Sequence, residues 1–193
     1  MLNGYKIFID AGHGGTDAGA VNSAAGLTEK TINLDIATRL NTRLQALGAT
    51  TLMSRTTDTF PSLASRVTAS NNFKANIYIS VHVNAGGGTG VETWVHDNAS
   101  SNTVKLAQSV NQVLASRLSA TSRGVKKAPS QRNNQNIYVI DPAVNKAWAI
   151  LPEVLFLDNA TDIPKLQSST YRQAAAEAIA TGVNNFVATL PPM

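Results

Sequence analysis

Tyr5-Lys-Ile-Phe-Ile-Asp-Ala-Gly-His-Gly-Gly15 is the stretch of sequence that decides the fold of this chain. Its first half, Tyr5–Asp10, has the pattern of a buried strand. Its second half packs three glycines around His13, which allows a sharp backbone turn and leaves the imidazole accessible. Open α/β sheets bind their ligands at strand ends. We therefore expect this turn to belong to an α/β domain and to lie near a functional site.

The rest of the chain alternates between helix and strand patterns. Thr28 is typical of a helix N-cap, and apolar residues then recur at helical spacing until Gly48. By the same criteria we expect strands at residues 50–54, 76–84, 91–97, 136–140 and 149–157, and helices at 62–73, 102–118 and 170–189. This order predicts a single α/β domain, with a twisted, mainly parallel sheet of about six strands and helices on both faces. We expect the domain to cover residues 1–189, and residues 190–193 to begin a linker or C-terminal stub.

The composition excludes several classes of site. The chain has no cysteine, which removes thiol nucleophiles, disulfides, iron–sulfur clusters and cysteine-type zinc sites. It has no apolar run of the ~18 residues that a transmembrane helix needs, and its N-terminus lacks the pattern of a secretory signal. The net charge of +4 is compatible with attraction to an anionic polymer, and equally with an ordinary protein surface that has no such partner. Basic residues cluster without the interleaved aromatic residues of a nucleic-acid groove, so we expect no nucleic acid partner.

Two of the three histidines follow or end predicted strands. His13 follows the first strand, and His82 lies on the polar face of the strand at residues 76–84, beside Asn84. Taken singly, such a histidine is better explained as a surface or core residue; together, the ligand and structural explanations are equally good. We expect the third histidine, His96, to be a surface residue.

Glu29 stands in the first turn of the predicted helix, where the helix dipole favours the ionised carboxylate that a metal needs. Ordinary helix capping explains Glu29 better when the residue is taken alone. A hydrolytic zinc site uses three ligands from histidine and acidic residues and leaves one position open, and His13, Glu29 and His82 fit that requirement. Ligand histidines need hydrogen-bond acceptors, and Asp10, Asp17 and Asn84 lie nearby in sequence to serve as such.

Glu153 is a charged residue within the apolar stretch at residues 149–157. A carboxylate in a buried strand is costly unless it is paired or functional. Pairing with an arginine and service as a general base and acid are equally good explanations. The remaining glycine-rich stretches match neither a dinucleotide fingerprint nor a phosphate loop, and there is no serine-hydrolase elbow.

Several separated blocks, in order, resemble the zinc-dependent N-acetylmuramoyl-L-alanine amidases of the type-3 class. The blocks extend over nearly the whole chain and lie at Ile9–Gly19, Leu27–Lys30, Ser54–Asp58, Ser80–Ala85, Gly90–Trp94 and Pro152–Asn159. The resemblance implies a mainly parallel sheet flanked by helices, with one Zn2+ per chain at the strand ends.

The resemblance also implies roles for particular residues. It assigns the metal to His13, Glu29 and His82 and catalysis to Glu153, in cleavage of the amide between N-acetylmuramic acid and L-alanine. We further expect Asn84 and Arg123 to contact the substrate, and Asp10 and Asp17 to orient the ligands.

The partner that this resemblance implies is peptidoglycan. We expect no nucleic acid, no membrane insertion and a monomer that acts on the cell wall. The protein would be released by lysis or a holin, as a phage endolysin or bacterial autolysin, or would be a domain of a secreted protein. A polysaccharide deacetylase and a wall-binding module without activity are the alternatives.

Some positions depart from the family pattern. Leu155 stands where a glycine is common, Asp158 where a serine is common, and Gln131–Asn136 forms a divergent polar loop that we expect to line the substrate groove. These departures leave the preference for the stem peptide open. No inserted segment is evident that would fill the cleft, so we expect an open site.

Overall fold

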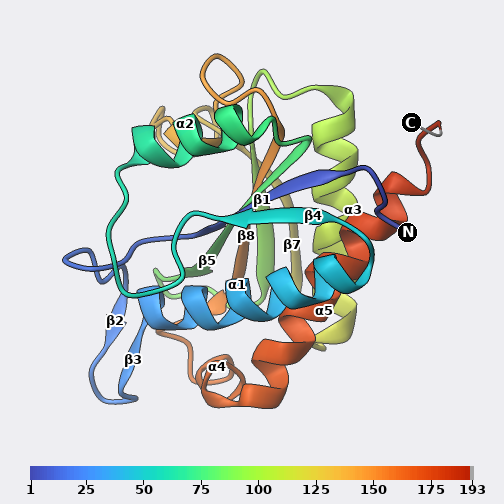
Figure 1. Cartoon of the computed structure of the whole chain (residues 1–193). Helices are drawn as coiled ribbons and strands as arrows, with labels where there is room; N and C mark the ends of the chain where they lie inside the picture. Colours follow the sequence, from blue (N-terminus) through green and yellow to red (C-terminus); the bar gives the residue numbers. More distant parts are fainter. Residues whose placement is uncertain (192–193) are drawn as a thin grey trace.

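The computed structural model describes residues 1–191, which form a six-stranded sheet in the order β4-β1-β5-β8-β6-β7 (Figure 1). The strands are β1 (Lys6–Ala11), β4 (Thr50–Met53), β5 (Ile77–Asn84), β6 (Val91–His96), β7 (Ser122–Ala128) and β8 (Trp148–Phe156). Neighbouring strands are parallel except β6 and β8, which are antiparallel. The predicted mainly parallel sheet is therefore confirmed. A two-stranded hairpin of β2 (Val21–Asn22) and β3 (Leu27–Thr28) precedes the first helix.

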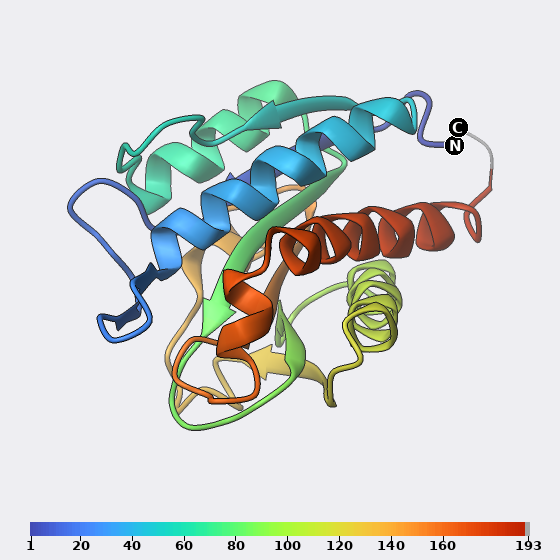
Figure 2. The same ribbon diagram turned by 90° about the horizontal axis from the view of Figure 1, so that it is seen from below.

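Helices cover both faces of the sheet, as the sequence predicts. One face carries α1 (Glu29–Ala46), α3 (Ser101–Arg117) and α5 (Ser169–Val187), and α5 lies between the other two (Figure 2). The other face carries α2 (Leu63–Phe73) and the short 3-10 helix η1 (Tyr138–Ile140). The short helix α4 (Ile163–Gln167) leads into α5. None of the helices within residues 1–191 is long and apolar enough to cross a bilayer.

Because helices cover both faces of the sheet, the alternation of apolar and polar residues along β5 does not separate a buried face from an exposed one. Tyr78 and Ser80, on the face that the sequence marks as polar, are fully buried. Tyr78 stacks on Phe8, and both belong to the smaller core beneath α2 and η1. Only the last polar residues of this face, His82 and Asn84, remain partly exposed, and they lie at the end of the strand.

Three local predictions need correction. The strand expected at residues 136–140 is the 3-10 helix η1, whose apolar residues pack onto the sheet instead of pairing with it. Strand β7 was not predicted, because it is an edge strand with the polar sequence Ser-Arg-Gly-Val-Lys-Lys-Ala. Helix α5 ends at Val187 and not at residue 189. The linker or stub expected at residues 190–193 lies partly outside the described residues and stays a prediction.

A buried ion pair ties β1 to α2. Arg66 Nη1 lies 2.6 Å from Asp10 Oδ1, and both side chains are almost inaccessible to solvent. Tyr78 Oη and Ser80 Oγ donate to the other oxygen of Asp10 at 2.8 and 2.7 Å. Burial alone would raise the pKa of Asp10, but the Arg66 charge and the hydrogen bonds from Ser80 and Arg66 outweigh it and hold the pKa below its usual value. Because Arg66 also donates to the carbonyl oxygen of His13, the ion pair fixes the turn that follows β1.

We predict that Asp10→Asn lowers the free energy of unfolding by about 3–5 kcal/mol, because it leaves the Arg66 charge buried and uncompensated. Urea denaturation at pH 7 measures this loss. The matched control is Glu177→Gln, since Glu177 pairs with Arg117 in a half-exposed position and should cost less than about 1 kcal/mol. Equal losses in the two variants would contradict the prediction.

The Asp10–Arg66 pair should also make the stability of the protein depend on pH. The pKa of Asp10 is lower in the folded than in the unfolded protein, so its stabilising contribution is complete above the unfolded value of about 4. The contribution disappears as the pH falls through the lower, folded pKa. The difference in stability between wild type and Asp10→Asn should therefore narrow below about pH 4.

Candidate metal centre and active site

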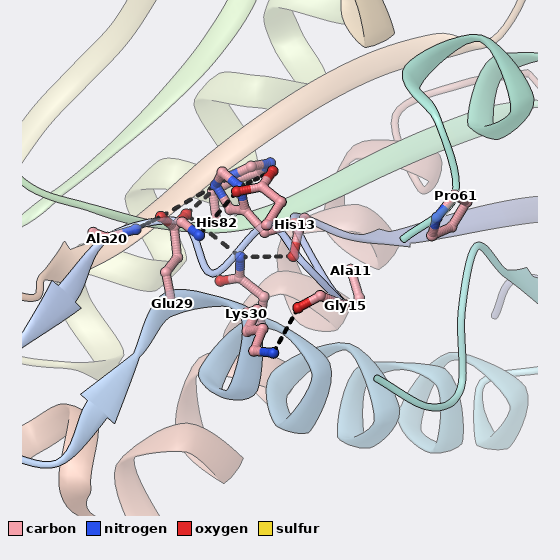
Figure 3. A network of polar contacts seen from close by, with 12 residues as sticks. Ala11, His13, Gly15, Ala20, Glu29, Lys30, Pro61 and His82 are labelled. Atoms are coloured by element: carbon pink, nitrogen blue, oxygen red, sulfur yellow. Dashed lines mark hydrogen bonds and ion pairs between the residues drawn. The ribbon is translucent and has the colours of Figure 1, made fainter. Parts of the chain in front are cut away.

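Three side chains meet at the ends of β1 and β5. His13 follows β1, His82 lies near the end of β5, and Glu29 is the first residue of α1; Figure 3 shows their polar groups turned toward one another. Glu29 Oε2 lies 3.2 Å from His13 Nε2, and Glu29 Oε1 lies 2.9 Å from His82 Nδ1. Two atoms bound to one zinc ion at 2.0–2.1 Å with tetrahedral angles lie roughly 3.3 Å apart. The cluster therefore has the donor types and the spacing of a metal site.

Glu29 does not serve as a helix cap. Its carboxylate accepts hydrogen bonds from the backbone N–H of Ala20 at 2.9 Å and of Val83 at 3.2 Å, which are both outside α1. Burial alone would raise the pKa of Glu29, whose exposed fraction is 5%, but bonding to His13 and His82 outweighs this and lowers the pKa strongly. The carboxylate is thus held in the ionised form that a cation needs.

The pKa of His13 moves in the opposite direction. Burial tends to lower it, but the carboxylates of Glu29 and Asp17 raise the pKa of His13 to about 9. Asp17 Oδ2 lies 2.8 Å from His13 Nδ1, which leaves Nε2 of the same ring facing Glu29. The surroundings of His13 and Glu29 therefore favour positive charge between them.

Two glycines make room for the cluster. A Cβ atom at Gly12 would lie 2.3 Å from His82 Nε2, and one at Gly19 would lie 2.6 Å from Glu29 Oε2. His13, between them, adopts a left-handed φ of 59°, which is strained for a residue with a side chain. The glycine-rich turn thus lets backbone and imidazoles approach closely.

The sequence expectation for Asp10 and that for Asp17 have different outcomes. Asp17 contacts a histidine of the cluster, as described above. Asp10 contacts neither His13 nor His82; its carboxylate is occupied by Arg66, Tyr78 and Ser80. Asp10 therefore supports the turn through Arg66 and not through a histidine.

Glu153 lies next to the cluster, since it pairs in register with His82 across β5 and β8. Its Oε2 atom is shut off from solvent and has no hydrogen-bond partner within residues 1–191. No arginine in that part of the chain pairs with it, so the structural explanation of this carboxylate is not supported. Burial is the main cause that raises the pKa of Glu153 to about 7, and the carboxylates of Glu29 and Glu92 add to it against the opposing histidines. Glu153 can therefore both accept and donate a proton near neutral pH.

A cavity of about 460 Å³ opens in front of these residues. Its wall includes the whole cluster, Glu153 and Asn84, together with aromatic and apolar side chains that the sequence did not single out. These additional side chains are Phe60, Leu63, Trp94, Ile137, Tyr138, Val139 and Leu151. Phe60, Leu63 and Tyr138 are exposed large hydrophobic residues, a feature that marks binding surfaces but is invisible in sequence periodicity.

Arg123 does not line the cavity. Its Nε donates to Glu92 Oε2 at 2.7 Å, and Glu92 is a buried residue that sequence reasoning missed. Glu92 Oε1 accepts from Asn84 Nδ2 at 2.9 Å and from Trp94 Nε1 at 3.1 Å, so it holds two residues of the cavity wall. Arg123 thus contacts the cavity wall only indirectly, through Glu92.

His96 is a buried residue and not the surface residue that the sequence suggested. Its exposed fraction is 7%, and its Nδ1 accepts a hydrogen bond from the backbone N–H of Asn98 at the end of β6. Its role in the structure is to close the turn after β6.

The two departures in the last strand also find a structural explanation. Leu155 has a left-handed φ of 66°, the conformation in which glycine is free of strain. Its side chain is fully buried in the main core, and that burial offsets the strain. Asp158 Oδ2 accepts from the backbone N–H of Gly86 and of Gly87, each at 2.8 Å, and so fastens the glycine loop after β5.

Comparison with known proteins identifies the family of this chain. The family model described as N-acetylmuramoyl-L-alanine amidase matches residues 7–185. N-acetylmuramoyl-L-alanine amidase LytC of Bacillus subtilis (strain 168) is 39% identical over 187 residues, which are 95% of this chain and 36% of that protein. The endolysin of Bacillus phage SPP1 is 33% identical over 182 residues, 92% of this chain and 64% of that protein. The chain thus spans about a third of the length of LytC and less than two thirds of that of the endolysin.

Solved structures show the same relationship. The N-acetylmuramoyl-L-alanine amidase of Clostridium difficile 630 superposes with a TM-score of 0.89 at 32% identity, covering 98% of this chain and 100% of that one. The catalytic domain of the amidase CwlV from Bacillus (Paenibacillus) polymyxa var. colistinus gives a TM-score of 0.84 at 30% identity, covering 96% and 99%. Sequence and fold therefore both show that the chain belongs to the N-acetylmuramoyl-L-alanine amidase family.

Proposed function

We propose that this chain is the catalytic part of a zinc-dependent hydrolase that cleaves the amide between N-acetylmuramic acid and L-alanine in peptidoglycan. The observation that carries the proposal is the meeting of His13, Glu29 and His82 beside the unpaired carboxylate of Glu153. Membership of the amidase family supports the identity of the bond.

The three clustered residues would hold one zinc ion per chain. Two imidazoles and one carboxylate are the ligands of many hydrolytic zinc sites. All three side chains line the cavity, so an ion held there would be within reach of a substrate. Asp17 supports the arrangement because its bond to His13 Nδ1 fixes the ring and directs Nε2 toward the centre. When bound, zinc supplies a Lewis acid that polarises the amide carbonyl and lowers the pKa of a water molecule.

Glu153 acts as the general base and then as the general acid. Its carboxylate takes a proton from the attacking water and later gives one to the departing amine of L-alanine. A pKa raised to about 7 suits both steps near neutral pH. We assign Asn84 to substrate contact and Arg123 to the support of Asn84 through Glu92.

This activity would act on the bacterial cell wall. LytC of Bacillus subtilis and the endolysin of phage SPP1 are both relatives of this chain, so its biological setting is wall turnover or lysis. We assign residues 1–189 to the catalytic domain, since the family match ends at residue 185 and α5 at Val187. The exposed apolar residues around the cavity offer a surface for the glycan.

We predict that the protein binds one Zn2+ and that His13→Ala or His82→Ala weakens binding by more than about 100-fold. This exceeds the 10- to 100-fold loss that follows removal of a supporting hydrogen bond. Isothermal titration calorimetry on metal-free protein measures the affinity. His96→Ala is the matched control, because it removes a histidine outside the cluster and should leave the affinity unchanged. Full affinity in either cluster variant would disprove the ligand assignment.

We predict that Gly12→Ala weakens zinc binding by about 10- to 100-fold, because the added methyl group occupies the space of the His82 ring. Gly88→Ala is the control, since its methyl group would meet the ring of Phe156 at a similar distance, outside the cluster. Both variants should lose some stability in thermal denaturation, but only Gly12→Ala should lose zinc affinity. Equal zinc affinity in the two variants would contradict the close-approach argument.

We predict that Glu153→Gln lowers kcat by about 100- to 10,000-fold and leaves zinc binding intact. The assay follows the release of free L-alanine amino groups from purified peptidoglycan, with released acetate measured in parallel. Glu177→Gln, on the surface of α5, is the control and should keep full activity. If Glu153→Gln matches the wild type, the role of Glu153 is wrong; if acetate is released instead of amino groups, the protein is a deacetylase.

A further inference from the structure

Arg132 is the feature of the cavity that the reaction described above does not use. It lies in the divergent polar loop between β7 and η1 and lines the same cavity as the His–Glu cluster and Glu153. Within residues 1–191 its guanidinium donates to no carboxylate or carbonyl. The other arginine of the wall, Arg66, is fully engaged by Asp10 and by backbone oxygens. Arg132 is therefore the one arginine or lysine of this wall, in the described part of the chain, that remains open to a ligand.

The loop that carries Arg132 is held in place by its own bonds. Ser130 donates from its backbone N–H and from its hydroxyl to Asp97 at 2.9 and 2.6 Å. Gln131 Oε1 accepts from the backbone N–H of Lys127 at 2.7 Å, and Gln135 N–H donates to the carbonyl of Arg132 at 2.9 Å. Arg132 is thus presented from a prearranged loop, which lowers the entropic cost of its contact with a ligand.

Apart from the two arginines, the acidic and basic side chains that line the cavity are the two histidines of the cluster and four carboxylates. Three of these carboxylates already have cationic partners, because Arg66 pairs with Asp10 and the histidines pair with Asp17 and Glu29. Within residues 1–191, Arg132 is the cation of the wall whose donors are free to meet an anionic group that enters the cavity beside the cluster. Arginine matches a carboxylate in geometry because its planar guanidinium can donate two parallel hydrogen bonds.

We infer that Arg132 recognises a carboxylate on the peptide part of the substrate and makes the enzyme prefer stems with a free carboxyl group over stems amidated there. The inference rests on the proposed amidase function. The glycan part of a muramoyl peptide offers hydroxyl and acetamido groups, whereas the peptide part offers carboxylates. An extended peptide advances about 3.5 Å per residue, so a carboxylate on the second residue lies roughly 7 Å from the scissile amide. A cavity of about 460 Å³ accommodates that separation.

The test compares two substrates that differ in one group. Both are glycan-linked L-alanyl-γ-D-glutamyl-L-lysine stems, one with a free α-carboxyl group on the glutamyl residue and one with a carboxamide. We expect Arg132→Gln to lower kcat/KM by about 10- to 100-fold for the free acid, the range typical of a lost charge-assisted hydrogen bond, and by less than about twofold for the amide. Arg132→Lys should retain part of the preference, because it keeps the charge but not the planar geometry.

Lys127→Gln is the matched control, since it removes an exposed cation that does not line the cavity. It should leave kcat/KM unchanged for both substrates. Thermal unfolding checks that the variants are folded. An equal loss on both substrates, or no loss on the free acid, would overturn the role of Arg132 while leaving the amidase proposal intact. If the wild-type protein loaded with zinc cleaves neither substrate nor whole peptidoglycan, the proposed function itself fails and the inference fails with it.

Discussion

A buried, ionised carboxylate is the constraint around which this site is organised. Glu29 is almost inaccessible to solvent, and a carboxylate in that position needs positive charge or hydrogen-bond donors close by. It finds them on two sides, in His13 after β1 and in His82 on β5, and in the backbone N–H groups of Ala20 and Val83. Because these partners come from segments far apart in the sequence, the carboxylate joins the first turn, the first helix and the central strand into one centre.

The topology of the sheet then decides what lies beside that centre. Strands β1, β5 and β8 are parallel neighbours, so their carboxyl ends meet at one edge and bring Glu153 next to His82. The antiparallel strand β6 continues the sheet on the other side of β8 and places Glu92 opposite Glu153. A parallel sheet alone would not bring Glu92 there, and with it the support of Asn84 and Trp94. The antiparallel direction of β6 therefore fixes the part of the cavity wall that Asn84 and Trp94 form.

The sequence predicts the parts of the molecule that repeat or that carry rare residues. The helix α1, the alternating strand β5 and the histidines at strand ends are of this kind, and family resemblance adds Glu153. It does not predict β7, because the edge position tolerates lysines and leaves no apolar alternation. It does not predict that Tyr78 is buried, because that burial comes from the cover of α2 and η1 over its face of β5. The hydrogen bonds that join Arg123 to Asn84 through Glu92 depend on the register between strands, and register cannot be predicted from local sequence patterns.

The central claim is that His13, Glu29 and His82 hold a zinc ion in this chain. Anomalous X-ray diffraction on crystals of the zinc-loaded protein, collected on either side of the zinc absorption edge, tests the claim most directly. We expect one strong anomalous peak per chain, about 2.0–2.1 Å from a ring nitrogen of each histidine and from a carboxylate oxygen of Glu29. A zinc-loaded crystal with its anomalous peak elsewhere, or with none between these three side chains, would contradict it.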